Sequence, residues 1–187
     1  MLLPVGVEVR PLEPHADYRG AFTEIYRASW FDGRPQPVQW NLVRSAATTL
    51  RGVHVHVVHS DYWTLAAGAA VVGLCDLRRR SPTFRRAVTI RVSGDEPKLL
   101  AIPPGVAHGF LFHRTSIHVY AVSSYWDTAD ELGCRWDDPE LAIPWTWPSD
   151  HIVDPLLSPR DRDAGSLAEL MDAIEPRQSG FFAPASC

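Results

Sequence analysis

The chain has 187 residues, of which 45% are hydrophobic and 21% are charged, and its formal net charge is −4. This length and composition indicate one folded domain with a sizeable core. We therefore expect residues 1–187 to form a single domain, with a tail from about residue 177. The negative charge balance excludes a general electrostatic attraction to nucleic acid.

The cysteines and the first residues of the chain indicate in which cellular compartment the protein works. Three widely spaced cysteines form no C-x-x-C pair, which argues against a disulfide framework or a cysteine zinc site and fits a reducing compartment. The first ten residues have no basic region and too short an apolar run for a signal peptide. No stretch approaches the roughly 20 apolar residues that span a bilayer. We expect a cytoplasmic protein that binds no membrane.

Short β-type segments separated by turn residues fill the middle of the chain, which has 16 prolines and 12 glycines. Segment 66–77 is apolar but contains two glycines, which favour two strands and a turn over a helix. Residues 88–92 alternate apolar and polar side chains, residues 99–102 form an apolar run that stops at two prolines, and residues 117–122 form another strand.

A helix is predicted near the end of the chain, over 166–175, where apolar residues are spaced three and four apart. Many short strands with frequent turn signals are typical of a β-sandwich or jelly roll. The predicted fold is therefore mainly β, with a few short helices and a C-terminal helix.

Two histidines share one face of a predicted strand. The string R-G-V-H-V-H at 51–56 places His54 and His56 on the same side and the valines on the other, because side chains alternate along a strand. Two histidines that face a barrel interior are unusual and suggest chemistry. A pair of hydrogen-bonded or rim-exposed histidines fits the pattern equally well.

Three further strings contain chemically useful groups. P-P-G-V-A-H-G-F at 103–110 marks a tight turn that sets His108 at the start of a strand. R-G-A-F-T-E at 19–24 contains an arginine, an aromatic ring and an acid, and L-S-P-R-D at 157–161 ends in Asp161. Each string alone is more typical of solvated surface than of a site.

Together these strings resemble the dTDP-4-dehydrorhamnose 3,5-epimerase family, in order, from about residue 19 to 161. The most specific matches are D-L-R-x-x-S-P-T-F at 76–84 and A-H-G-F at 107–110. The others are R-G-x-F-x-E at 19–24, Q-x-N at 39–41, R-G-x-H at 51–54, W-D-D-P at 136–139 and L-S-x-x-D at 157–161. The resemblance implies a cupin jelly-roll β-barrel that pairs as a homodimer.

The resemblance also implies an activity: epimerisation of a dTDP-linked 4-keto-6-deoxy sugar, in deoxysugar biosynthesis, by proton removal beside the ketone and reprotonation from the opposite face. This reaction implies no redox cofactor and no metal. By match to the motifs, His54 is the expected base, Asp161 orients it, and Tyr120 is the expected acid. Whether C3, C5 or both carbons invert stays open.

The remaining site residues are expected to bind the substrate. Arginine forks suit a diphosphate, so the resemblance assigns Arg19 and Arg51 to it. His108 is expected to line the pocket. The nucleotide contacts implied by the resemblance are Phe22, by stacking, and Glu24, Gln39 and Asn41, by hydrogen bonds.

The chain departs from the family pattern at the sugar end of the expected pocket. His56 stands where the family usually has glutamine. About ten residues after the base histidine the family has a lysine that supports the enolate oxygen, and that position is read as Thr64. A family Tyr-Tyr pair is replaced by a Tyr-Trp pair that contains Trp126. These departures suggest an altered sugar or an altered choice of carbon.

Two other functions fit the same fold. Many cupins bind a metal through H-x-H and a later histidine, so His54, His56 and His108 would suit a metal-dependent oxygenase or isomerase. The usual glutamate after H-x-H is absent, and only Asp61 is near. The second alternative is a sugar-nucleotide-binding protein without turnover, which the loss of the family lysine suggests.

Overall fold

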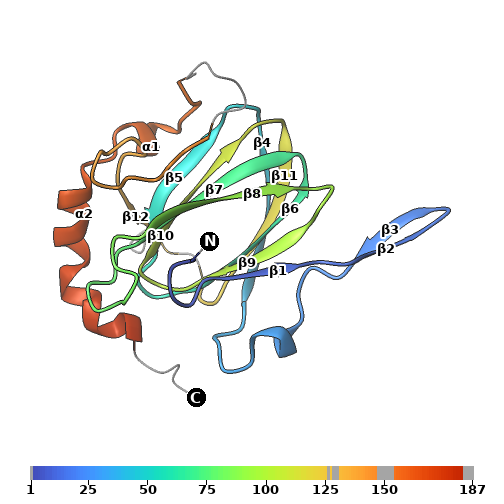
Figure 1. Cartoon of the computed structure of the whole chain (residues 1–187), viewed down its shortest axis with the longest axis horizontal. Helices are drawn as coiled ribbons and strands as arrows, with labels where there is room; N and C mark the ends of the chain where they lie inside the picture. The colour runs from blue at the N-terminus through green and yellow to red at the C-terminus, as the bar shows by residue number, and fades with distance from the viewer. Residues whose placement is uncertain (1, 126, 128–130, 147–153, 183–187) are drawn as a thin grey trace.

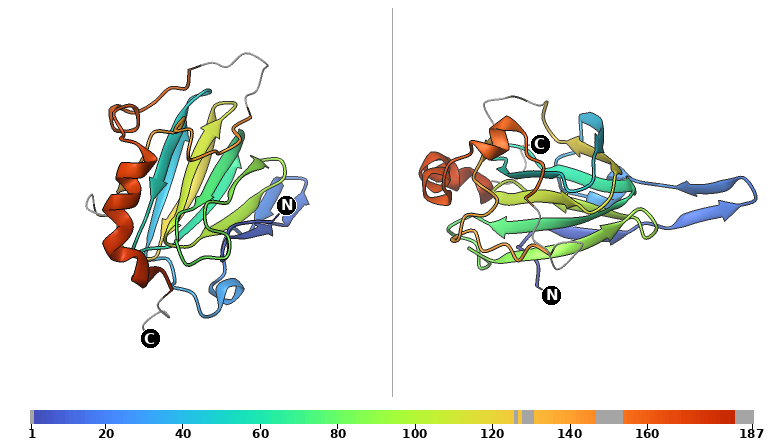
Figure 2. Two further views of the ribbon diagram at one scale, coloured as in Figure 1. Left: turned by 60° about the vertical axis from the view of Figure 1, so that its left-hand side comes forward. Right: turned by 90° about the horizontal axis from the view of Figure 1, so that it is seen from above.

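A computed structural model of the chain describes residues 2–125, 127, 131–146 and 154–182. Two antiparallel five-stranded sheets face each other as a sandwich (Figures 1 and 2). The first sheet has the order β1-β9-β6-β11-β4, with β1 (Glu8–Pro11), β9 (Lys98–Ile102), β6 (Asp61–Ala67), β11 (Ser116–Val122) and β4 (Gln39–Ser45). The second has the order β12-β5-β10-β7-β8, with β12 (Leu132–Gly133), β5 (Leu50–Val55), β10 (Val106–Phe112), β7 (Ala69–Asp76) and β8 (Ala87–Ser93).

The predicted strands are confirmed. Segment 66–77 is divided between β6 and β7 by Gly68, whose φ of +99° is a conformation that glycine adopts without strain. The alternating segment is β8, the run before the two prolines is β9, and segment 117–122 lies in β11. The sequence prediction of a mainly β jelly roll is therefore confirmed.

Apolar side chains fill the space between the sheets and also cover their outer faces. The inner cluster includes Trp63, Leu74 and Phe112. On the outer face of the second sheet, Val53 and Val55 pack against helix α2 (Leu167–Ile174). The alternation of β5 thus sends its valines outward to the helix, whereas His54 and the next residue but one, His56, face the cavity.

Helix α2 confirms the predicted C-terminal helix. Its N-cap Ser166 and Glu169 form a capping box, which satisfies two free N–H groups of the first turn. The following 3₁₀ segment η3 (Glu175–Phe182) stays on the barrel, since Phe181 is buried in the outer cluster and Gln178 donates to the carbonyl of Leu77. The tail expected from residue 177 is thus packed as far as Phe181, and 183–187 lie outside the described residues.

The motif D-L-R-x-x-S-P-T-F builds a buried ion pair rather than a surface of the cavity. Asp76, fully buried, accepts from Arg78 Nε and Nη2, both at 2.8 Å, and from the hydroxyls of Ser81 and Thr83, both at 2.6 Å. Burial raises the pKa of Asp76, but these hydrogen bonds and the charge of Arg78 outweigh it and lower the pKa. The cluster holds the turn between β7 and β8.

A two-stranded hairpin of β2 (Pro14–Asp17) and β3 (Gly20–Thr23) projects from the sandwich (Figure 1). The 3₁₀ turn η1 (Ala28–Phe31) then returns the chain to the sandwich, where Phe31 packs on the outer face of the first sheet. The short helix α1 (Pro159–Arg162) precedes α2. Among the described residues, no helix is both long and apolar enough to cross a membrane.

Candidate active site

A cavity of about 710 Å³ opens between the two sheets. Strands of both sheets and the segment before and within α1 contribute side chains to it. Its lining contains Val43, Thr49, Arg51, His54, His56, Asp61, Trp63, His108, Phe110, His118, Tyr120, Glu131, Leu156, Leu157, Ser158, Arg160 and Asp161. Six residues expected from the sequence thus meet in one cavity: His54, Tyr120, Asp161, Arg51, His56 and His108.

The shortest contact in this set joins His54 to Asp161, which are 107 residues apart in sequence. His54 Nε2 lies 2.6 Å from Asp161 Oδ1, and the Gly52 N–H donates to Asp161 Oδ2 at 3.4 Å. Asp161 is held in place by α1, because its backbone N–H donates to the N-cap hydroxyl of Ser158. The carboxylate is 6% exposed, so its interaction with the imidazole is little screened by water.

The electrostatics of Asp161 favour a charged carboxylate. Burial raises its pKa, but the hydrogen bond and charge of His54 and the donors Gly52 N and Ser158 outweigh burial, and the pKa is lowered. Arg160 Nη2 also approaches His54 Nε2, at 2.5 Å, and Arg160 forms an ion pair with Glu131. One ring nitrogen cannot donate to Asp161 and accept from Arg160 at once, so the two contacts are alternatives.

Tyr120 lines the cavity from the opposite sheet. It lies on β11, whereas His54 lies on β5, so the expected acid and base approach the cavity from facing walls. Burial is the main cause that raises the pKa of the Tyr120 phenol, and the charges of Asp61 and Glu131 raise it further. The phenol is therefore protonated near neutral pH and can donate.

Imidazoles gather around Asp61. The distances from its carboxylate oxygens to Nε2 are 3.8 Å for His56, 3.9 Å for His108 and 3.9 Å for His59, and the rings of His56 and His59 stack. Burial, and next the charge of His56, lower the pKa of His108 well below its usual value. The set that the structure brings together as possible metal ligands is His56, Asp61 and His108, without the His54 of the sequence-based alternative.

Thr64 does not line the cavity. On β6 the side chains of Asp61 and Trp63 reach the cavity, and Thr64 lies between Trp63 and Leu65, on the face of the sheet where Tyr62 packs in the outer cluster. The residue that β6 contributes beside the imidazoles is thus Asp61, a carboxylate. A count of about ten residues from His54 leads to Thr64, whereas the side chains of β6 that line the cavity are those of Asp61 and Trp63.

Aromatic side chains form a further part of the cavity wall. The rings of Trp63 and Phe110 stack with centroids 4.7 Å apart, and His118 stacks on Phe112 at 5.1 Å. Burial, and next the charge of Arg51, lower the pKa of His118 to about 4, so its ring is neutral. Trp63, Phe110, Phe112 and His118 are not among the site residues expected from the sequence, because aromatic side chains in strands usually belong to the core.

Two of the expected nucleotide contacts lie on the edge strand β4. Gln39 Nε2 donates to Asn41 Oδ1 at 3.0 Å, and both residues share the strand face of Val43, which does line the cavity. Asn41 is paired in register with Tyr120. Neither Gln39 nor Asn41 is itself part of the cavity lining, so they flank it.

The structure does not bring Arg19, Phe22 and Glu24 to this cavity. All three lie on or beside the projecting hairpin, with Phe22 65% exposed. Arg19 is ion-paired with Asp17 and Glu24 with Arg27, each at 2.6 Å. Trp126 lies outside the described residues.

Comparison with known proteins places the chain in a family. The family model for dTDP-4-dehydrorhamnose 3,5-epimerase matches residues 5–169. A dTDP-4-dehydrorhamnose 3-epimerase of Streptomyces niveus is 36% identical over 184 residues, covering 92% of this chain and 86% of the relative. A dTDP-4-dehydrorhamnose 3,5-epimerase of Pseudomonas aeruginosa is 35% identical over 161 residues, covering 82% and 86%.

Solved structures with a similar fold include epimerases of the same family. The crystal structure of ChmJ, a 3′-monoepimerase from Streptomyces bikiniensis in complex with dTDP-quinovose, superposes with a TM-score of 0.82 at 28% identity, covering 96% of this chain and 97% of ChmJ. The cupin fold expected from the motifs is thereby confirmed. The chain belongs to the dTDP-4-dehydrorhamnose 3,5-epimerase family, and it is a sugar-nucleotide epimerase of the 3,5- or 3-inverting kind.

Proposed function

We propose that the cavity epimerises a dTDP-4-keto-6-deoxyhexose with His54 as base, Asp161 as the residue that orients it, and Tyr120 as acid. The observation that supports this most strongly is the 2.6 Å contact between His54 Nε2 and the buried Asp161 carboxylate. With the Nε2 proton donated to Asp161, the lone pair on Nδ1 is the one that can accept a substrate proton.

The proton path follows from the two walls of the cavity. The C4 ketone makes the neighbouring C–H acidic. His54 takes that proton, and the electron pair moves onto the ketone oxygen as an enolate. Asp161 stabilises the resulting imidazolium, since their charges are opposite and little screened. Tyr120 then gives its phenolic proton to the same carbon from the opposite face, which inverts the configuration.

Arg51 is proposed to hold the diphosphate at the cavity. Its Nε is fixed by a hydrogen bond to Ser45 Oγ at 3.0 Å, while the guanidinium still lines the cavity. A guanidinium fork suits two phosphate oxygens. The stacked Trp63 and Phe110 offer apolar surface for the 6-deoxy sugar or the nucleotide base.

Proton exchange in heavy water tests the activity and the choice of carbon. The test incubates dTDP-4-keto-6-deoxyglucose with the full chain in D₂O and follows C3 and C5 by NMR. We expect deuterium at C3, and deuterium at C5 as well if both carbons invert. If the bound substrate gains deuterium at neither carbon, the proposed activity on this sugar is wrong.

We further propose that the chain works as a homodimer in the cytoplasm, with the hairpin of β2 and β3 supplying Arg19, Phe22 and Glu24 to a second copy. Two features support a pair. An isolated two-stranded hairpin with an exposed aromatic ring gains little stability on its own. The strand β4 is a sheet edge that exposes Trp40 and Leu42, a surface suited to pairing.

Mixing two inactive variants tests whether the hairpin acts in trans. His54→Gln lacks the base but keeps the hairpin, and Arg19→Ala combined with Phe22→Ala keeps the base but lacks the hairpin contacts. A mixed dimer contains one site with both an intact His54 and an intact hairpin only if the hairpin crosses to the partner subunit. Activity recovered on mixing supports this arrangement, and a monomer by light scattering or an absence of recovery contradicts it.

A further inference from the structure

A cluster of nitrogen and oxygen groups on the cavity wall has no part in the proton path from His54 to Tyr120. His56 directly follows β5, Asp61 begins β6 and His108 lies in β10, so the cluster joins the two sheets. The three residues are 7%, 5% and 4% exposed, respectively. Two imidazoles gathered around one buried carboxylate at a cavity are an arrangement typical of functional sites.

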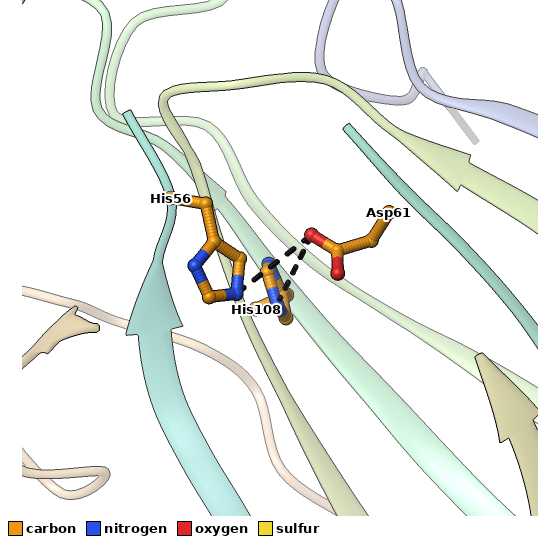
Figure 3. Close-up of side chains that lie close together, drawn as sticks. All are labelled: His56, Asp61 and His108. Carbon is orange, nitrogen blue, oxygen red and sulfur yellow. Dashed lines mark ion pairs between the residues drawn. The ribbon is translucent and has the colours of Figure 1, made fainter. Parts of the chain in front are cut away.

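The geometry of the cluster suits a shared ion. Figure 3 shows the rings of His56 and His108 directed at the same carboxylate of Asp61. Nε2 of each ring is 3.8 or 3.9 Å from Asp61 Oδ2, and the three ligand atoms all lie within 4.8 Å of one another. These separations exceed hydrogen-bond distance. Two ligands about 2.1 Å from a tetrahedral ion are about 3.4 Å apart, so closing the site would shorten each histidine–carboxylate separation by about half an ångström, and the separation of the two imidazole nitrogens by no more than about 1.4 Å.

We propose that His56, Asp61 and His108 bind one divalent transition-metal ion of the Zn²⁺ class inside the cavity. Two imidazole nitrogens and one carboxylate oxygen are a donor set that such ions favour, whereas Mg²⁺ and Ca²⁺ favour oxygen ligands alone. Three protein ligands leave a coordination position open toward the cavity, as in catalytic zinc sites. His59 stacks on His56 and supports its ring orientation.

The negative charge of Asp61 suggests what a bound ion would do in the reaction. Asp61 lines the same cavity as His54 and Tyr120, and a bare carboxylate there opposes the negative charge that develops on an enolate oxygen. A bound divalent cation offsets the carboxylate and presents positive charge to that oxygen. This catalytic role rests on the proposed function, whereas binding of the ion does not.

Metal binding is tested on the full chain after removal of adventitious metal with a chelator. Zn²⁺ binding is measured by equilibrium dialysis, and Co²⁺ is used as an optical probe, because its visible absorption reports the number and kind of ligands. The variants are Asp61→Asn and His56→Gln, each close in shape to the native residue. His113→Gln is the matched control, since His113 bonds the Thr146 carbonyl and lies outside this cavity.

We expect one ion per chain in the wild type and in the control. Each ligand variant should bind at least about 100-fold more weakly, because loss of a partner that merely supports a ligand already weakens metal sites 10–100-fold. Unfolding temperatures of the metal-free proteins show whether the variants are folded. Absence of stoichiometric binding, or equal binding by folded Asp61→Asn, would overturn the proposal.

Deuterium exchange on the same samples separates this proposal from the proposed function. Exchange that rises when metal is restored supports the catalytic role of the ion. Equal exchange with and without the ion overturns that role and leaves the epimerase intact. An ion bound at the predicted residues without exchange in either state contradicts the proposed activity and leaves the metal site standing.

Discussion

Asp161→Asn isolates the electrostatic contribution of the carboxylate, since the amide has nearly the same shape. The carboxylate faces His54 at 2.6 Å and is 6% exposed. Taking charge centres about 4 Å apart and an effective dielectric constant of about 20, the ion pair formed when His54 gains a proton is worth about 4 kcal/mol. Each 1.36 kcal/mol is a tenfold change in rate, so kcat should fall about 10³-fold.

The assay for Asp161→Asn is steady-state epimerisation followed by NMR, with a thermal melt of each protein. KM should change little, because the amide removes charge needed only when the proton is on His54. Asp163→Asn, an exposed acid two residues later, is the control and should keep full activity. A folded Asp161→Asn variant that keeps more than a tenth of wild-type kcat would refute the pairing argument.

Three further predictions follow from other contacts. Tyr120→Phe removes the acid but not the base, so deuterium should still enter the substrate from the His54 face. The rate of inversion, followed by NMR of the product, should fall at least about 100-fold. An equal loss of deuterium entry and of inversion would contradict separate roles for the two residues. Asp76→Asn breaks a buried ion pair and should lower the free energy of unfolding by about 3–5 kcal/mol in urea. Because folding lowers the pKa of Asp76, its carboxylate stabilises the protein above the unfolded pKa of about 3.9. The difference in free energy of unfolding between wild type and variant should therefore shrink as the pH falls below that value, and a difference independent of pH would refute this. Ser166→Ala removes the cap of α2 and should cost about 1 kcal/mol, a fall of about 2–4 °C in the unfolding temperature, with activity unchanged; an unchanged melting temperature would contradict the capping role.

Strand periodicity predicted much of the site. Alternation along β5 correctly placed His54 and His56 on the cavity side, with the valines under α2. Motif order correctly brought Asp161 and Tyr120 to the same cavity, although neither is near His54 in sequence. The first result rests on a local rule, because a strand fixes the direction of each side chain once its position is known. The second rests on the resemblance to the family, because Asp161 lies in α1 and no local pattern links it to His54.

The placements that the sequence alone did not predict depend on loop length or on another part of the structure. A fixed count from His54 selected Thr64, but the loop that precedes β6 sets the register of that strand and turns Asp61 toward the imidazoles instead. Trp63, Phe110 and His118 are not among the site residues expected from the sequence, since nothing local reveals that a sheet face borders a cavity. The placement of Arg19 and Phe22 on a projecting hairpin likewise has no signal in their own segment.

The most direct test of the account compares wild type with His54→Gln in D₂O, using dTDP titration to show that the variant still binds nucleotide. Base catalysis by His54 predicts that deuterium enters beside the ketone in the wild type and that His54→Gln slows this entry at least about 10³-fold, with dTDP affinity unchanged. Deuterium entry at the wild-type rate in a folded, nucleotide-binding His54→Gln variant would contradict the central claim.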